Sequence, residues 1–123
     1  GTTGRPKGVV ITHANCSNLI SWWQRFFSLR PHDRVLQFSS YSFVMSLRQI
    51  FPTLAAGATL VLPTRPEAFG EACEAHRVTK LVMTPSALET LDGIPSSVQA
   101  VQVAGERPSL NLAQRWADAL EEK

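Results

Sequence analysis

The stretch "TKLVMTPSALETL" at residues 79–91 decides the fold that this sequence predicts. Its first half holds a continuous apolar run, Leu81, Val82 and Met83, without the polar alternation of a strand that faces water on one side. Such a run is typical of a strand that is covered on both faces of its sheet. Thr84 and Pro85 then end the strand, and residues 86–91 have the pattern of a short helix. The stretch therefore predicts a strand that passes directly into a helix.

The same alternation of strand and helix continues on both sides of this stretch. Strands are expected at residues 34–40, 58–63, 78–85 and 98–105, and a short hydrophobic strand at 8–12. Helices are expected at residues 13–29, 47–56, 66–77, 86–91 and 109–122, with Gly57 as a left-handed end and Ser109 as a cap. This alternation predicts an α/β fold built from βαβ units around a largely parallel sheet. Ligands would then collect at the carboxyl ends of the strands, near the loops after Ser40, Pro63, Thr84 and Gly105.

The helix expected at residues 13–29 carries six large apolar side chains at helical spacing. Such spacing predicts one broad apolar face that is buried against the sheet. The paired aromatic residues also permit a second reading, as a platform on which a ligand ring stacks, but core packing is the favoured one. The six residues are Leu19, Trp22, Trp23, Phe26, Phe27 and Leu29.

Composition excludes several kinds of partner. The chain has 123 residues, 44% of them hydrophobic, and a formal net charge of +2 without a basic tract. We therefore expect a core of useful size, and neither a nucleic acid nor a membrane as partner. Cys16 and Cys73 lack metal-site spacing, which favours free buried thiols in a reducing cytoplasm. The start without methionine and the abrupt end lead us to expect a chain that is truncated at both ends.

The opening octet "GTTGRPKG" combines three glycines with hydroxyl groups and one lysine. Glycine lets backbone N–H groups approach a ligand closely, and lysine is a mobile positive charge suited to a polyphosphate. The spacing differs from that of the GxxxxGK[ST] nucleotide loop. An ordinary turn with a solvated lysine is the alternative. The residues concerned are Gly1, Thr2, Thr3, Gly4, Lys7 and Gly8.

With the short hydrophobic segment and "TH" that follow, the octet resembles the phosphate loop of the adenylate-forming, or AMP-binding, superfamily. That superfamily contains acyl-CoA synthetases, luciferases and the adenylation domains of nonribosomal peptide synthetases. The resemblance implies that Gly1, Thr2, Thr3, Gly4 and Lys7 hold the phosphates of ATP, with Lys7 as the catalytic residue. His13 matches a histidine that is frequent at this loop, although a plain helix-start position is the alternative.

Downstream segments are similar to the adenylation-domain branch in particular. They are "DRVLQF", "SFVMSLRQIF", "LAAGATLV", "TKLVMTPS" and "VQVAGE", and with the octet they spread the resemblance over the whole chain. The resemblance implies a central slice of the family's large N-terminal domain, covering residues 1–123. It places Gly105 and Glu106 near the adenine, and it gives the acyl pocket these residues: Phe43, Val44, Met45, Arg48, Ser86, Gln102 and Ala104.

Three positions within the segment "SFVMSLRQIF" depart from the family pattern. Val44 stands where the family has an aspartate that pairs with the substrate's α-ammonium group. Because a buried ammonium without a countercharge is unfavourable by several kcal/mol, the expected substrate is a carboxylic acid that lacks the α-amino group. Gln49 replaces a glutamate. Arg48 either pairs with an acidic group of the substrate or lies on a solvated helix face.

Other pocket residues also have structural alternatives. Met45 is equally well read as core filler, and Ser86 as the cap of the helix that follows it. Ala104 replaces the commoner glycine and so narrows the space beside it. His32 and His76 lack partners at useful spacing and are expected at the surface, and no metal site is expected.

The resemblance implies that the intact parent activates a carboxylic acid with ATP, accompanied by Mg²⁺, to an acyl-adenylate. The acyl group would then pass to the phosphopantetheine thiol of a carrier domain in the same assembly line. Two alternatives remain: a stand-alone acyl- or aryl-CoA ligase, and a non-catalytic domain that binds a nucleotide or a partner. The 123 residues alone are expected to be inactive.

Overall fold

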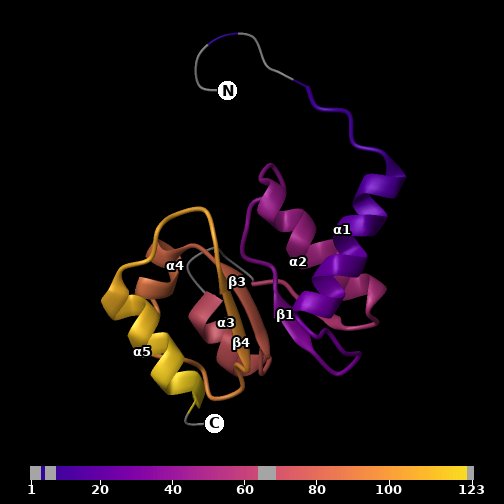
Figure 1. Ribbon diagram of the computed structural model, residues 1–123. Helices are drawn as coiled ribbons and strands as arrows, with labels where there is room; N and C mark the ends of the chain where they lie inside the picture. The colour runs from indigo at the N-terminus through magenta and orange to yellow at the C-terminus, as the bar shows by residue number, and fades with distance from the viewer. Residues whose placement is uncertain (1–3, 5–7, 64–68, 122–123) are drawn as a thin grey trace.

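The computed structural model describes residue 4, residues 8–63 and residues 69–121. Within these residues the chain forms four strands and five helices (Figure 1). The strands are β1 (Arg34–Leu36), β2 (Thr59–Val61), β3 (Lys80–Met83) and β4 (Ala100–Val103). The helices are α1 (His13–Phe26), α2 (Val44–Ala55), α3 (Phe69–Ala75), α4 (Pro85–Glu89) and α5 (Leu110–Glu121). Each of these elements lies where the sequence predicts one; most have shorter bounds, whereas α2 begins three residues and α4 one residue earlier than predicted.

All four strands run parallel in one sheet with the order β2-β1-β3-β4. In the register, Val35 of β1 lies beside Leu60 and beside Lys80, and Val82 of β3 lies beside Gln102 of β4. The predicted α/β class with a parallel sheet is therefore confirmed.

Helices cover both faces of this sheet (Figure 1). On one face, Trp23 of α1 packs with Val35 and Val82, and α2 contributes Met45 at the margin. On the other face α3, α4 and α5 enclose the larger core, which includes Leu81 and Met83. Because consecutive residues of β3 point to opposite faces, its unbroken apolar run fills both cores.

The order of the strands creates a reversal between β1 and β3. The chain leaves β1 through α2 towards β2, whereas it leaves β3 through α4 towards β4 on the other side. The two helices lie on opposite faces, so the loops after β1 and β3 diverge at the carboxyl edge of the sheet. Open α/β sheets bind ligands at such a reversal point.

Only part of the apolar face of α1 is buried. Trp23 is 1% exposed, and Phe27 and Leu29 are also buried, whereas Trp22 is 46% and Phe26 58% exposed. The last two rings stack on each other with centroids 4.8 Å apart and planes 12° apart. The prediction that the whole aromatic face is core is therefore wrong for these two. A helix buries only the stripe that faces its neighbours, and two aromatic pairs span more than that stripe.

Three helices end in the same way. After α1, α2 and α3 the chain turns through a left-handed residue, namely Ser28, Gly57 and Arg77, with φ of 49°, 71° and 50°. In each case two backbone N–H groups return to the last turn of the helix, for example Arg77 to the carbonyl of Glu74 (3.1 Å) and Val78 to that of Cys73 (2.9 Å). This is the Schellman geometry, which favours glycine. Gly57 confirms the predicted end of α2.

Two further predictions have mixed outcomes. The short strand expected at residues 8–12 is wrong: this segment pairs with none of the four strands, and Val10 is 91% exposed. A strand needs a hydrogen-bonded neighbour, and none lies beside this segment in the part of the chain that is described. Both cysteines are free, as expected; Cys73 is fully buried and Cys16 is half-buried.

Candidate functional site

The carboxyl ends of β3 and β4 are tied together by a pair of side chains. Ser86, at the start of α4, donates its hydroxyl to the Glu106 carboxylate over 3.0 Å, and its backbone N–H points at the same carboxylate over 3.4 Å. Glu106 follows β4, so the bond joins the two loops predicted to gather ligands. The helix cap is Thr84, whose hydroxyl accepts from the N–H of Ala87 over 3.3 Å. The capping alternative for Ser86 is therefore wrong.

Gly105 lies in a close approach between β3 and α2. Its φ of 92° belongs to the region that favours glycine. A Cβ at this position would meet the Thr84 methyl at 3.4 Å and the Met45 terminal methyl at 3.5 Å. Met45 thus reaches from α2 to the end of β4 while packing against the core of that face. The core-filler reading of Met45 is confirmed, and its role as a pocket wall stays a prediction.

The amino end of α2 carries the two candidates that precede Met45. Phe43 occupies the N-cap position without a side-chain cap, and Val44 is the first helical residue. Their side chains are 68% and 69% exposed. The first turn of α2 contains no acidic residue. This end of the helix therefore offers a partial positive charge and an apolar surface, with no carboxylate in that turn to receive an ammonium group.

Arg48 lies against α1. Its guanidinium carbon is 5.4 Å from the centroid of the Trp23 ring, a cation–π geometry, and the residue is half-buried. Arg48, on α2, thus contacts α1 through the Trp23 ring. This half-buried position differs from a solvated helix face, and the pairing of Arg48 with substrate stays a prediction.

Gln49 links the two sides of the reversal point. It is fully buried, donates its amide N–H to the Val82 carbonyl of β3 (2.8 Å) and accepts from the N–H of Ser39 after β1 (3.0 Å). An amide supplies this donor and this acceptor at once, which an ionised carboxylate cannot do. The glutamine found in place of the family's glutamate is therefore a fully used structural residue.

Two glutamine oxygens on the same face of the sheet are buried without a hydrogen-bond partner. They are Oε1 of Gln102, on β4, and Oε1 of Gln37, just after β1. By the register, Gln37 aligns with Val82 and so with Gln102. The Gln37 amide nitrogen is already committed to the Ser39 carbonyl at 2.6 Å. Both oxygens therefore retain the capacity to accept a hydrogen bond. Ala104, the next candidate, extends the strand ladder by donating to Met83 (3.1 Å).

Most of the predicted phosphate loop lies outside the described residues, including Gly1, Thr2, Thr3 and Lys7. Gly4 is described, with a φ of 115° and open space where a Cβ would stand. That backbone conformation is rare for residues with a side chain, which fits the predicted use of glycine. After the loop, Thr12 and Asn15 form a reciprocal capping box at the start of α1. His13 begins the helix and is exposed.

Within the described residues no three acidic, histidine or cysteine side chains gather into a metal site. Among those residues, too, no helix has the length and apolar character needed to cross a membrane. The surroundings of Gly105 fit a nucleotide, because its exposed backbone stands in a cradle that a Cβ would narrow. Polar side chains at Ser86 and Glu106 stand beside it.

The chain belongs to the family of AMP-binding enzymes, which matches residues 1–123. It is similar to phosphinothricin tripeptide synthetase PhsC of Streptomyces viridochromogenes, with 40% identity over 96% of this chain and 11% of that protein. It is also similar to the nonribosomal peptide synthetase atnA of Emericella nidulans, with 37% identity over 95% of this chain and 2% of that protein. The chain thus spans a small part of these relatives.

Solved structures agree with this assignment. The adenylation domain AlmE of Vibrio cholerae, in complex with glycyl-adenosine-5'-phosphate, has a TM-score of 0.86 and 28% identity over 98% of this chain and 25% of that one. The nonribosomal peptide synthetase FmoA3 has a TM-score of 0.82 and 33% identity over 96% of this chain and 14% of that one. The fold is that of adenylation domains in the AMP-binding family.

Sequence reasoning missed two residues of the candidate site. The sequence indicates Thr84 only as the point where a strand ends, and Gln37 only as part of the "DRVLQF" match. Gln37 carries one available signal, because it is the polar residue that follows the apolar pair Val35 and Leu36. Its unpaired oxygen, however, depends on which groups surround it in three dimensions.

Proposed function

We propose that the intact parent of this chain is an ATP-dependent ligase that converts a carboxylic acid to an acyl-adenylate. The acyl group then passes to the phosphopantetheine thiol of a carrier domain. The observation that carries the proposal is the convergence of Met45, Ser86, Gly105 and Glu106 at the reversal point of an AMP-binding fold. Membership of an assembly line is supported by the similarity to peptide synthetases.

In this proposal the residues of the chain position the reactants. Lys7 and the glycine-rich loop offset the charge on the phosphates of ATP, and Mg²⁺ is held mainly by those phosphates. Gly105 and Glu106 lie near the adenine of the nucleotide. Ser86, hydrogen-bonded to Glu106, connects the nucleotide side with the acyl side. The carboxylate would attack the α-phosphate of ATP, forming the acyl-adenylate while pyrophosphate leaves.

The substrate class rests on the amino end of α2. Val44 is exposed at the first helical position, in a turn that holds no acidic residue. A helix amino end also disfavours a nearby cation. We therefore propose an acid without an α-amino group, namely an aryl, α-keto, α-hydroxy or fatty acid. The acyl pocket would be completed by Phe43, Met45, Gln102 and Ala104, whereas Arg48 acts through its contact with Trp23.

Pyrophosphate exchange by the intact parent tests the proposal directly. A panel of standard L-amino acids is compared with aryl, α-keto, α-hydroxy and fatty acids at equal concentration. We expect the strongest exchange from the second group. A standard L-amino acid as the best substrate would overturn the substrate class while leaving the ligase assignment intact. ATP binding without exchange by any acid would instead favour a non-catalytic domain.

The thiol acceptor needs a separate measurement. The adenylated parent is offered a phosphopantetheinylated carrier domain or free coenzyme A, and acyl transfer to each is followed by mass spectrometry. Transfer to the carrier supports the assembly-line reading, and transfer to coenzyme A supports a stand-alone ligase. Because the chain covers 25% of AlmE, we further propose that residues 1–123 are one part of an adenylation domain.

A further inference from the structure

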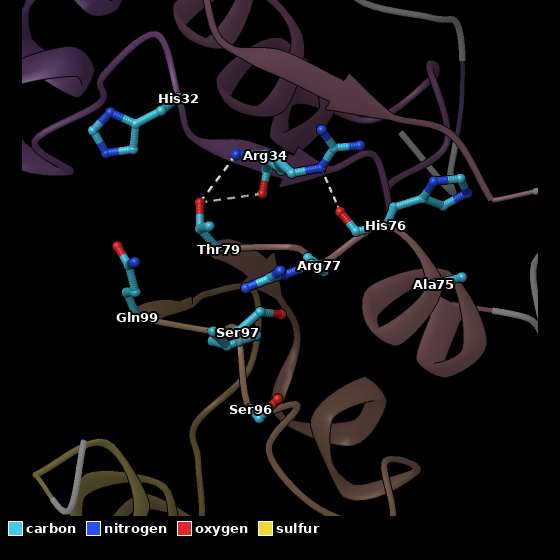
Figure 2. A pocket seen from close by; sticks show the side chains of 10 residues that line it. His32, Arg34, Ala75, His76, Arg77, Thr79, Ser96, Ser97 and Gln99 are labelled. Atoms are coloured by element: carbon cyan, nitrogen blue, oxygen red, sulfur yellow. Dashed lines mark hydrogen bonds between the residues drawn. The ribbon is translucent and has the colours of Figure 1, made fainter.

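A pocket of about 580 Å³ lies at the amino ends of β1, β3 and β4, the edge of the sheet opposite to the candidate site (Figure 2). Its volume falls in the range of small-molecule sites. Polar side chains from separate parts of the chain meet there: His32, Arg34, His76, Arg77, Ser96 and Gln99. Nothing in the proposed ligase chemistry uses this pocket.

The described side chains that line this pocket carry positive charge and no negative charge. Two arginines line it, and among the described residues no aspartate or glutamate does so. Two acidic residues adjoin lining residues in sequence. Glu74, which precedes Ala75, is exposed, whereas Asp33 is 1% exposed and accepts from the Thr79 hydroxyl (2.7 Å) and from the N–H of Arg30 (2.8 Å). The pocket therefore presents a positive field with hydroxyl and amide groups around it.

Arg34 is held in place before any ligand arrives. Its Nε donates to the carbonyl of His76, and its backbone N–H donates to the Thr79 hydroxyl at 3.0 Å (Figure 2). A guanidinium group has five N–H donors in a fixed plane, so four remain after the Nε contact. A fixed arginine loses little side-chain freedom when it binds an oxyanion.

Arg77 stands where glycine would be less strained. It occupies the left-handed position after α3 with a φ of 50°, the position that Gly57 fills after α2. A side chain in this conformation is unfavourable relative to glycine by about 1 kcal/mol. In Figure 2 the Arg77 side chain extends from the end of α3 towards the side of the pocket that holds Ser97 and Gln99. Such a strained position is a reason to look for a role of the side chain.

We propose that this pocket binds the phosphate group of a small phosphorylated molecule, with Arg77 pairing to the phosphate oxygens and Arg34 adding positive charge from the His76 side of the pocket (Figure 2). Guanidinium groups match phosphate geometry and form strong charge-assisted hydrogen bonds with it. The space beyond one phosphate group, with Ser96 and Gln99 on its wall, suits the polar remainder of a sugar or alcohol phosphate.

Variants of the intact parent can separate binding from folding. Arg77→Gly removes the guanidinium while relieving the strained backbone, so the variant is expected to be at least as stable as the wild type. Ser28→Gly makes the same backbone change after α1 and serves as the matched control. Calorimetric titration with ribose 5-phosphate, inorganic phosphate and acetate is carried out at constant ionic strength.

We expect Arg77→Gly to weaken ribose 5-phosphate binding at least tenfold and Ser28→Gly to change it less than twofold. Any binding at the phosphate loop is common to all three proteins and cancels in this comparison. Arg34→Lys keeps the positive charge and should change binding less than twofold, whereas Arg34→Gln, which removes that charge, should weaken binding severalfold.

Four results would overturn the proposal in whole or in part. Equal affinity in the wild type and Arg77→Gly would remove the pocket as the site. A lower thermal midpoint of Arg77→Gly without ligand would show that Arg77 pairs with another part of the parent. Acetate binding as tightly as either phosphate would exclude a phosphate site. Inorganic phosphate binding as tightly as the sugar phosphate would identify free phosphate as the source and overturn the sugar or alcohol phosphate.

Discussion

The hydroxyl of Ser86 lies 3.0 Å from the carboxylate of Glu106, and this bond joins the loops that follow β3 and β4. The two residues are 20 positions apart in the chain. The family resemblance assigns Ser86 to the acyl pocket and Glu106 to the adenine side. Their hydrogen bond therefore links the acyl side of the candidate site to its adenine side.

Ser86→Ala and Glu106→Ala are therefore expected to act as one change in the parent. Each removes the same hydrogen bond, so each should raise the KM of pyrophosphate exchange, and the double variant should be no worse than the poorer single variant. Because both residues are exposed, the unfolding free energy should stay within about 1 kcal/mol of the wild type. Additive losses would show that the two side chains work separately.

Val44→Asp is expected to admit α-amino acids. The carboxylate would stand at the first position of α2, where a negative charge favours the helix by roughly 0.3–1 kcal/mol, so the variant should fold. Val44→Asn, which adds polarity without charge, is the matched control. Pyrophosphate exchange with L-amino acids should rise at least tenfold in the aspartate variant alone. An equal gain with asparagine would show that charge is not the deciding property.

Gln49→Glu, which restores the family residue, is expected to destabilise the parent. The new carboxylate keeps the bond from Ser39 but loses the donor to the Val82 carbonyl, in a fully buried position. An unpaired buried carbonyl costs about 1–3 kcal/mol. Urea unfolding measures the loss, which should shrink at acidic pH because a protonated carboxyl regains a donor. Unchanged stability at neutral pH would mean that a water or another group replaces the amide.

Trp22 and Trp23 are neighbours with opposite surroundings, and their alanine variants should differ accordingly. Trp23 is 1% exposed, so Trp23→Ala leaves a cavity and should cost about 3–5 kcal/mol in urea unfolding. Trp22 is 46% exposed and stacks mainly on Phe26, so Trp22→Ala should cost under about 1 kcal/mol. If the two losses are equal in the parent, another part of that protein covers Trp22.

Cys73 is expected to resist alkylation in the folded protein. Burial, with the charge of Glu74 as a smaller cause, raises the pKa of the Cys73 thiol to about 11. The thiolate is the reactive form, so iodoacetamide at pH 8 should label Cys73 only after denaturation, as read by peptide mass spectrometry. The half-buried Cys16 serves as the internal comparison.

The same raised pKa gives a pH dependence of stability. In the unfolded chain the thiol ionises at lower pH than in the folded one, so the stability present below the unfolded pKa is lost as pH rises towards 11. The expected loss is about 2–3 kcal/mol, since one pKa unit corresponds to about 1.4 kcal/mol. Cys73→Ala should flatten this part of the profile. A profile that keeps its slope in the alanine variant would assign the effect to other groups.

Local pattern was enough to predict the elements of this fold. The apolar run of β3 and the helix after it follow from side-chain periodicity, and Gly57 marks the end of α2 because few other residues adopt its φ. The same reasoning failed at residues 8–12. Their β-branched side chains favour a strand, but a strand forms only where a partner supplies hydrogen bonds.

The α/β class, the succession of strands and helices along the chain, and the AMP-binding family could be read from sequence, because they depend on periodicity and on motifs that lie within short stretches. The contacts of each candidate side chain follow only from the tertiary structure. Arg48 lies over Trp23, Ser86 bonds to Glu106, and Gln49 bridges β3 and the loop after β1. The pocket around Arg34 and Arg77 also exists only in three dimensions. Contacts between residues far apart in the chain arise from packing, which no local pattern records.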